Sequence, residues 1–130
     1  MRAVLTPDDL KKGEPAQPGW YPAEIINYEE AVTKGTADKP SDGSINAIFT
    51  FKILDGDASV KGREFKRFFN EKVLSFGKNL WNVLFQFDKV KGGELTSEMF
   101  RSSVGKKLMV YVAKDKKTGY DTIEDYRPLV

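Results

Sequence analysis

The sequence contains no cysteine and no histidine. Without cysteine the chain can form no disulfide, no thiol nucleophile and no thiolate metal site, which suits a reducing compartment. Without histidine it lacks the commonest metal ligand and the usual general base near neutral pH. Carboxylate, lysine and tyrosine chemistry stay open, but the composition favours a protein that is not an enzyme and that needs no metal or other cofactor.

Long apolar runs are also missing. The N-terminus lacks the apolar run of a signal peptide, and no later stretch is long enough to span a bilayer. We therefore expect a cytoplasmic protein without membrane contacts. A chain of 130 residues can bury a core as one domain, which we place at residues 19–130. Residues 1–18 form an extended arm, in which Thr6, Pro7 and Gly13 carry the signals of a short helix.

Positive charge is concentrated in the middle of the chain. Between residues 61 and 117 there are 14 Lys and Arg against 6 Asp and Glu, which leaves +8 there and −6 in the rest. A basic centre between acidic ends is typical of a protein with a basic groove for nucleic acid, provided that the cations also gather in space.

Alternating polar and apolar residues predict five strands, over residues 20–28, 45–54, 62–70, 106–114 and 120–126. A helical period follows the third strand, with Ser75 as its cap; its core stripe contains Phe76, Leu80, Val83, Leu84 and Phe87.

Three further segments complete this description. Residues 29–44 have no apolar period and are predicted to form a long loop. Residues 96–100 are predicted to form a short helix capped by Thr96. Trp81 and Phe85 lie on a second stripe of the longer helix, which either packs against the N-terminal segment or forms an exposed docking patch.

The order of these elements predicts a mainly β fold. Three strands, a helix and two more strands are typical of the five-stranded oligonucleotide-binding (OB) barrel, whose second and third strands line the binding face. An SH3-like barrel and an open α+β sheet are alternatives. The helix between the third and fourth strands favours the OB barrel.

The candidate site is centred on residues 62–70, where aromatic and cationic side chains are interleaved. Aromatic faces stack on bases, and Arg and Lys meet phosphates. The alternative is that Phe65 and Phe69 belong to the core and the charges only solvate the opposite face.

Alternation indicates which side chains point outward. With Phe65 and Phe69 in the core, Phe68 lies on the outer face between cations. Arg63 and Arg67 share the parity of the buried residues, so we expect them at the barrel rim or at a bulge, still within reach of phosphate. The predicted nucleic-acid-binding residues are Lys52, Arg63, Lys66, Arg67, Phe68, Lys107, Tyr111 and Lys114. Trp20, Tyr28 and Met109 could extend this groove, although Trp20 and Met109 fit cross-strand packing better.

Carboxylates do not converge in the predicted topology. The acidic groups lie on predicted turns and strand ends, and they are Asp55 with Asp57, Glu29 with Glu30, and Asp121 with Glu124 and Asp125. A metal-dependent nuclease needs carboxylates that meet on rigid elements. We therefore interpret these acids as solvated.

Several short motifs resemble a known family. They are residues 19–25 (GWYPAEI), the Phe-rich second strand, Gly62-Arg63 with Phe65, Phe69-Asn70-Glu71, and Val104-Gly105-Lys106. Over about residues 19–128 the chain is similar to single-stranded DNA-binding proteins of bacteriophage replication modules, long described only as a domain of unknown function. The resemblance implies an OB barrel that coats single strands during phage replication or recombination in the host cytoplasm. Many such proteins end in an acidic tail that recruits replication partners, whereas this chain ends in YRPLV.

These features predict a sequence-tolerant single-stranded DNA-binding protein, a monomer or a dimer. Stacking and phosphate contacts do not read the 2′-hydroxyl, so RNA fits the same pattern. The alternative is an interaction module of the same fold that binds no nucleic acid and docks a replication or recombination protein through Trp81 and Phe85.

Overall fold

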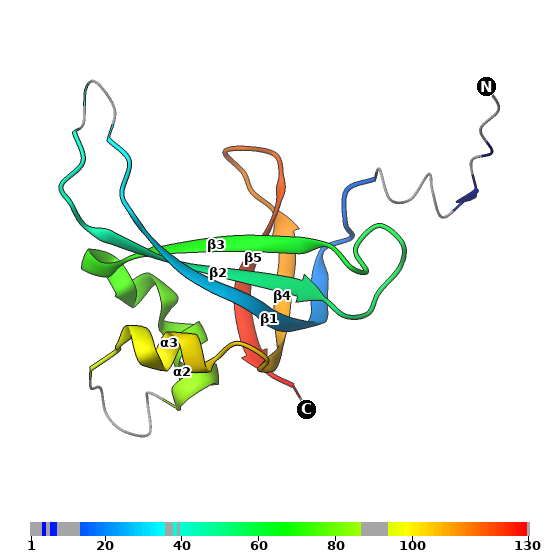
Figure 1. The fold of residues 1–130 in the computed structure, drawn as a ribbon. Helices are drawn as coiled ribbons and strands as arrows, with labels where there is room; N and C mark the ends of the chain where they lie inside the picture. Colours follow the sequence, from blue (N-terminus) through cyan, green and yellow to red (C-terminus); the bar gives the residue numbers. More distant parts are fainter. Residues whose placement is uncertain are drawn as a thin grey trace.

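Five strands form one antiparallel sheet in the computed structural model, which describes residues 4, 6–7, 14–35, 38, 40–86 and 94–129. The strands are β1 (Gly19–Val32), β2 (Ile45–Ile53), β3 (Glu64–Asn70), β4 (Lys107–Lys114) and β5 (Asp121–Pro128), in the order β3-β2-β1-β4-β5 (Figure 1). The predicted mainly β class and the five strands are confirmed. The predicted N-terminal helix falls mostly outside the described residues.

Strand β1 is long enough to pair with a strand in each half of the sheet. Its residues 19–24 pair with β4, and its residues 23–32 pair with β2. The register shifts between Ile25 and Asn27, and such a bulge bends a strand and increases its twist. The predicted loop from residue 29 was wrong at its start, because β1 continues to Val32, opposite Ile45.

The outermost strands of the sheet order, β3 and β5, are joined by side chains. Arg67 Nη1 donates to Thr122 Oγ1 at 3.1 Å. Next to it, Arg63 Nη1 lies 2.7 Å from Asp121 Oδ2. These two contacts bring Arg63 and β3 to the first residues of β5, and β1, β2 and β3 cross in front of β4 and β5 in Figure 1.

The helical segments η1 (Glu71–Gly77), α2 (Lys78–Phe85) and α3 (Ser97–Ser102) lie between β3 and β4. The short helix capped by Thr96 is confirmed, since Thr96 Oγ1 accepts from Met99 N. A single helix from Ser75 was wrong: Asn70 caps a 3-10 segment, and the regular helix begins only at Lys78. Within the described part of the chain, no helix has the length and apolarity needed to cross a membrane.

The kink between η1 and α2 changes which aromatic residue is buried. Phe76, predicted in the core, is 84% exposed, whereas Trp81 is 2% exposed. The indole stacks on Phe100 at 4.9 Å between ring centroids and meets Phe69 edge-on at 5.1 Å. Gly77 lies so close under this ring that a Cβ there would be 2.6 Å from it. The exposed patch predicted for Trp81 was therefore wrong, whereas the N-terminal segment predicted to cover it falls mostly outside the described residues.

Part of the predicted core of the helix is confirmed. Leu80 and Leu84 are buried, Val83 is only half-buried against the core, and Phe87 lies outside the described residues. The strand side of this core contains Phe49, Phe51, Phe65 and Phe69. The opposite faces of β2 and β3 are thereby turned outward.

Candidate nucleic-acid interface

An exposed phenylalanine stands on the outer face of β2 and β3. Phe68 is 61% exposed and lies opposite Ile48 on β2, which is only 8% exposed. Lys66 on the same face lies opposite Thr50. The predicted outward orientation of Lys52, Lys66 and Phe68 is confirmed. A ring so exposed can take a second planar group on its free face.

Acidic neighbours accompany two of the predicted cations on this face. Lys66 Nζ lies 3.6 Å from Glu29 Oε1, and both side chains are about half exposed. Such a surface pair contributes little and can open, so Lys66 stays available to an anion. Lys52 lies in register between Glu24 and Glu64, which lowers the local positive potential around it.

The two arginines already have protein partners. Arg63 pairs with Asp121, and its guanidinium carbon lies 4.9 Å from the centroid of the Phe65 ring. Arg67 lies half-buried in the β3–β5 seam, bonded to Thr122, rather than at the rim where we expected it. Both side chains therefore connect β3 or the residue before it to the first two residues of β5.

Asp121, predicted to be a solvated acid, is instead only 6% exposed at its side chain and holds several parts of this seam together. It accepts from Ala16 N at 2.9 Å as well as from Arg63. Burial raises the pKa of Asp121, but the hydrogen bonds from Ala16 and Arg63 lower it more, so the pKa lies below its ordinary value. The ionised form is therefore the one that stabilises the fold.

Replacing Asp121 by asparagine should lower the free energy of unfolding by about 1–3 kcal/mol at pH 7. Because the folded-state pKa is depressed, this contribution is present above about pH 4 and is lost as the pH falls through the folded-state value. Urea unfolding of both proteins at pH 7 and pH 3 measures it, with Glu64→Gln as a control for an exposed acid. An equal difference at both pH values would contradict the role of the charge.

A second aromatic group lies on the outer face of β1 and β4. Tyr111 pairs in register with Trp20, and their rings meet edge-on at 5.4 Å. The Arg127 guanidinium covers the Trp20 ring at 4.4 Å. The predicted packing role of Trp20 is confirmed, and Met109 likewise lies in register between Pro22 and Arg127.

The two aromatic groups lie far apart along the sheet. Phe68 connects through Ile48 to Glu29, and Tyr111 pairs with Trp20. Glu29 and Trp20 are separated along β1 by a path of roughly 30 Å at ~3.3 Å per residue. Lys107 and Lys114 lie exposed near the two ends of β4, opposite Glu24 and Asp121. The eight predicted residues are therefore spread over both halves of the sheet, with Lys107, Tyr111 and Lys114 on β4 and the other five on or next to β2 and β3.

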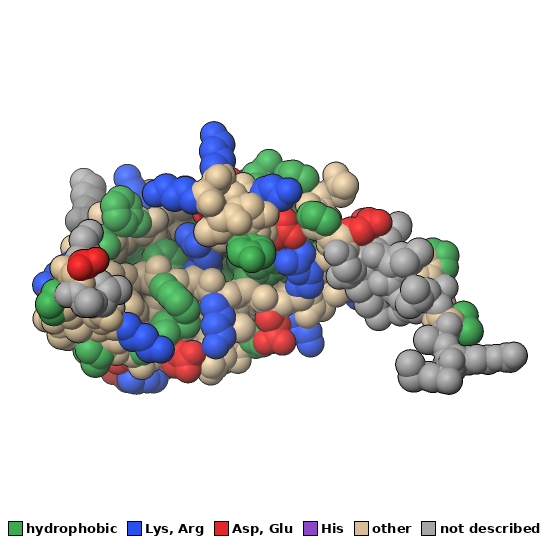
Figure 2. Space-filling view, turned by 90° about the horizontal axis from the view of Figure 1, so that it is seen from above, with side chains coloured by type: hydrophobic (Ala, Val, Ile, Leu, Met, Phe, Trp, Pro, Cys, Tyr) green, Lys and Arg blue, Asp and Glu red, His purple; other side chains and the backbone are tan. Residues whose placement is uncertain are grey.

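The β4–β5 loop adds exposed residues that the sequence analysis did not assign to the site. Lys116 and Lys117 are exposed, and Tyr120, predicted in a strand, is 78% exposed just before β5. Asp115 Oδ1 accepts from the backbone of residues 117 and 118, which lowers its pKa, and Arg67 on β3 is near enough to lower it further. Figure 2 views the molecule from the side on which this loop projects, and it shows Lys and Arg around exposed hydrophobic side chains.

Asn70 ties the base of the 33–44 segment to β3. Its Nδ2 lies within 3.0 Å of acceptors on three residues, Thr33, Ser44 and Asn46. The Thr33 and Ser44 hydroxyls also bond to each other. An amide at the end of β3 thus holds Thr33 and Ser44, the two ends of this segment, together.

Replacing Asn70 by alanine should lower the free energy of unfolding by about 1–3 kcal/mol, because half-buried hydroxyls lose their donor. Backbone amide exchange at Thr33 and Ser44 should accelerate, while exchange in β4 stays slow. Thermal unfolding and hydrogen exchange measure the two effects. Asn79→Ala, at an exposed position where the amide bonds only to Asp125 among the contacts described, is the control.

Among the described residues, no three carboxylates are placed to hold a metal ion together.

Comparisons with known proteins assign no family. No family model matches the chain, and no curated protein matches it in sequence.

Proposed function

We propose that this chain is an OB-type barrel that binds single-stranded nucleic acid, with single-stranded DNA as its ligand, on the outer face of β2 and β3. Its strand order, the helices between β3 and β4, and the side-chain seam from β3 to β5 all fit that architecture. The β1–β2 and β4–β5 loops would form the walls of the binding face.

The exposure of Phe68 is the observation that carries the proposal. With Phe68 61% exposed, its strand forfeits part of the about 1.5–3 kcal/mol that full burial of a Phe contributes, and a binding face explains that cost. Stacking on an aromatic ring accepts any base, so the interaction is tolerant of sequence. Lys66 beside it, and Lys116 and Lys117 on the loop, would neutralise phosphates.

Titration of a fluorescent oligo-dT, followed by anisotropy at several salt concentrations, tests this function. With three to five phosphates neutralised, log Kd should rise with log salt at a slope of about 2 to 3.5. Duplex DNA of equal length should fail to displace the oligonucleotide, because its bases are already stacked. Absence of binding at low salt, or binding that ignores salt, would overturn the proposal.

The alternative function, docking of a partner protein, requires Trp81 and Phe85 to form an exposed surface. Trp81 lies in the core, and Phe85 is half-buried, with its ring 6.1 Å from that of Phe100 and 5.3 Å from Lys106 Nζ. A partner could reach that stripe only by opening the core.

A further inference from the structure

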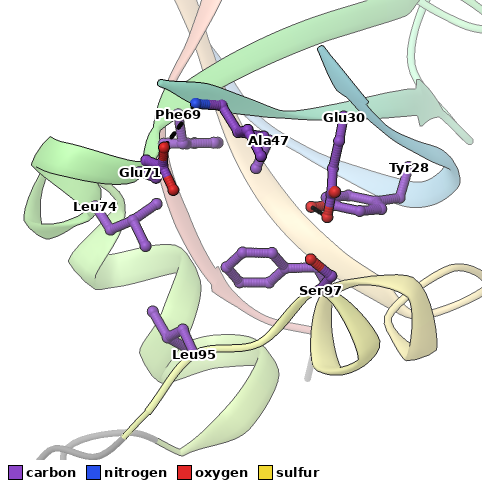
Figure 3. Close-up of a pocket in the computed structure, with 10 residues that line it drawn as sticks. Tyr28, Glu30, Ala47, Phe69, Glu71, Leu74, Leu95 and Ser97 are labelled. Carbon is purple, nitrogen blue, oxygen red and sulfur yellow. Dashed lines mark hydrogen bonds between the residues drawn. The ribbon is translucent and has the colours of Figure 1, made fainter. Parts of the chain in front are cut away.

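A cavity of about 120 Å³ opens on the other side of the strands that carry the Phe68 face. Ala47 and Phe69 lie in its wall, and they alternate along β2 and β3 with the outward-facing Ile48 and Phe68. The remaining apolar wall comes from Leu74, Leu95 and Phe100. Figure 3 shows these side chains around a common space between the sheet and the helical segments.

The cavity has the size and lining of a site for one apolar side chain. A cavity of roughly 150 Å³ lined by Leu, Ile and Phe binds benzene. The cavity here is slightly smaller and is open on one side, so a phenyl or isobutyl group can enter it from solvent.

Two carboxylates stand beside this apolar space. Glu30 and Glu71 lie on opposite sides of it in Figure 3. Tyr28 donates its hydroxyl to Glu30 at 2.9 Å, and Glu71 accepts from Ile45 N at 2.8 Å. Hydrogen bonds from Ser97 and Tyr28 lower the pKa of Glu30, so Glu30 is ionised at neutral pH.

The surroundings show that this rim attracts cations. Arg101 Nη2 lies 3.7 Å from Glu30 Oε1, and the Arg101 side chain is itself mostly exposed. No Lys or Arg is among the described residues that line the cavity. The lining thus contains two carboxylates and no cation, which distinguishes this site from the proposed nucleic-acid face.

We propose that this cavity binds a segment of a partner protein in which an apolar side chain adjoins a Lys or Arg. The apolar group fills the space between Phe69, Leu74 and Phe100, and the cation is held by Glu30 and Glu71. Because the cavity and Phe68 lie on opposite sides of the same strands, such a partner can stay bound while a single strand occupies the outer face. This proposal does not depend on nucleic-acid binding.

Two peptides with opposite flanking charge test it on the full chain. Titration of ¹⁵N-labelled protein with Ac-Lys-Phe-Lys-NH₂ should shift amide signals around Ile45 and Leu95 in a saturable way. Ac-Glu-Phe-Glu-NH₂ should bind at least about 10-fold more weakly, since it loses the ion pairs with Glu30 and Glu71 and brings like charges beside them. Equal affinity of the two peptides, or shifts elsewhere on the surface, would overturn the proposal.

Variants separate the charge from the cavity. The double variant Glu30→Gln, Glu71→Gln keeps acceptors for Tyr28 and Ile45, and it should remove the preference for the Lys peptide while the protein stays folded. Glu64→Gln, an exposed acid on the outer face, should retain the preference. Saturating oligo-dT should leave the peptide titration unchanged, and displacement of the peptide by oligo-dT would place both ligands on one site and refute the inference.

Discussion

Replacing Phe68 by alanine should weaken oligo-dT binding by about 5- to 150-fold, the equivalent of the 1–3 kcal/mol that one stacked base contributes. The fold should be unaffected, because a side chain that is 61% exposed contributes little to the core. Phe68→Trp should preserve or strengthen binding, since a larger ring offers more stacking area. Anisotropy titration at fixed salt, together with the Tm of each variant, provides the measurement.

Phe76→Ala is the matched control for this result. Phe76 is even more exposed than Phe68, but it lies on η1 and not on the β2–β3 face. Its removal should change neither affinity nor Tm. Equal losses of affinity in both variants would mean that exposed rings bind DNA without a defined site. A fall of several degrees in the Tm of Phe68→Ala alone would assign that ring to the packing of the fold.

Where polar and apolar residues alternate strictly along a strand, the side of the sheet that each side chain faces could be predicted from the sequence alone. Along β2 and β3 each side chain faces the side opposite to its neighbour's, so the outward position of Phe68 follows from the burial of Phe65 and Phe69. The same argument could not identify what Arg63 and Arg67 contact. Their partners, Asp121 and Thr122, lie 58 and 55 residues away in the chain, and only the tertiary fold brings them together.

The positions of Tyr111 and Phe68 on different halves of the sheet could also not be predicted from the alternation pattern of single strands. Both residues point outward, and the alternation of side chains along each strand, taken alone, predicted one groove for both. Register decides otherwise, because β1 lies between the two halves of the sheet and pairs with β2 and β4 mainly over different parts of its length. Along β1 a single strand that contacted both rings would have to span roughly 30 Å, whereas Arg67, next to Phe68, is near enough to Asp115 in the β4–β5 loop to lower its pKa.

Trp81→Ala should cause the largest loss of stability, about 3–5 kcal/mol, in a domain whose total stability is expected to be only about 5–15 kcal/mol. The indole fills the space between β3, α3 and Gly77, and its Nε1 donates to Leu74 O at 2.7 Å. Trp81→Phe keeps most of the apolar contact but leaves this carbonyl without its donor, so we expect an intermediate loss. Chemical denaturation followed by circular dichroism measures all three proteins.

Trp20→Ala distinguishes a core tryptophan from a surface one. Trp20 is only half-buried, between Tyr111 and Arg127, so its loss should cost clearly less than the loss of Trp81. The prediction from the helical period placed Trp81 away from the core, because it assumed one continuous helix from Ser75. A 3-10 segment precedes α2 instead, so α2 is rotated relative to that continuous helix. Equal costs for the two tryptophans would contradict this packing and would reopen the Trp81 stripe as a surface for a partner protein.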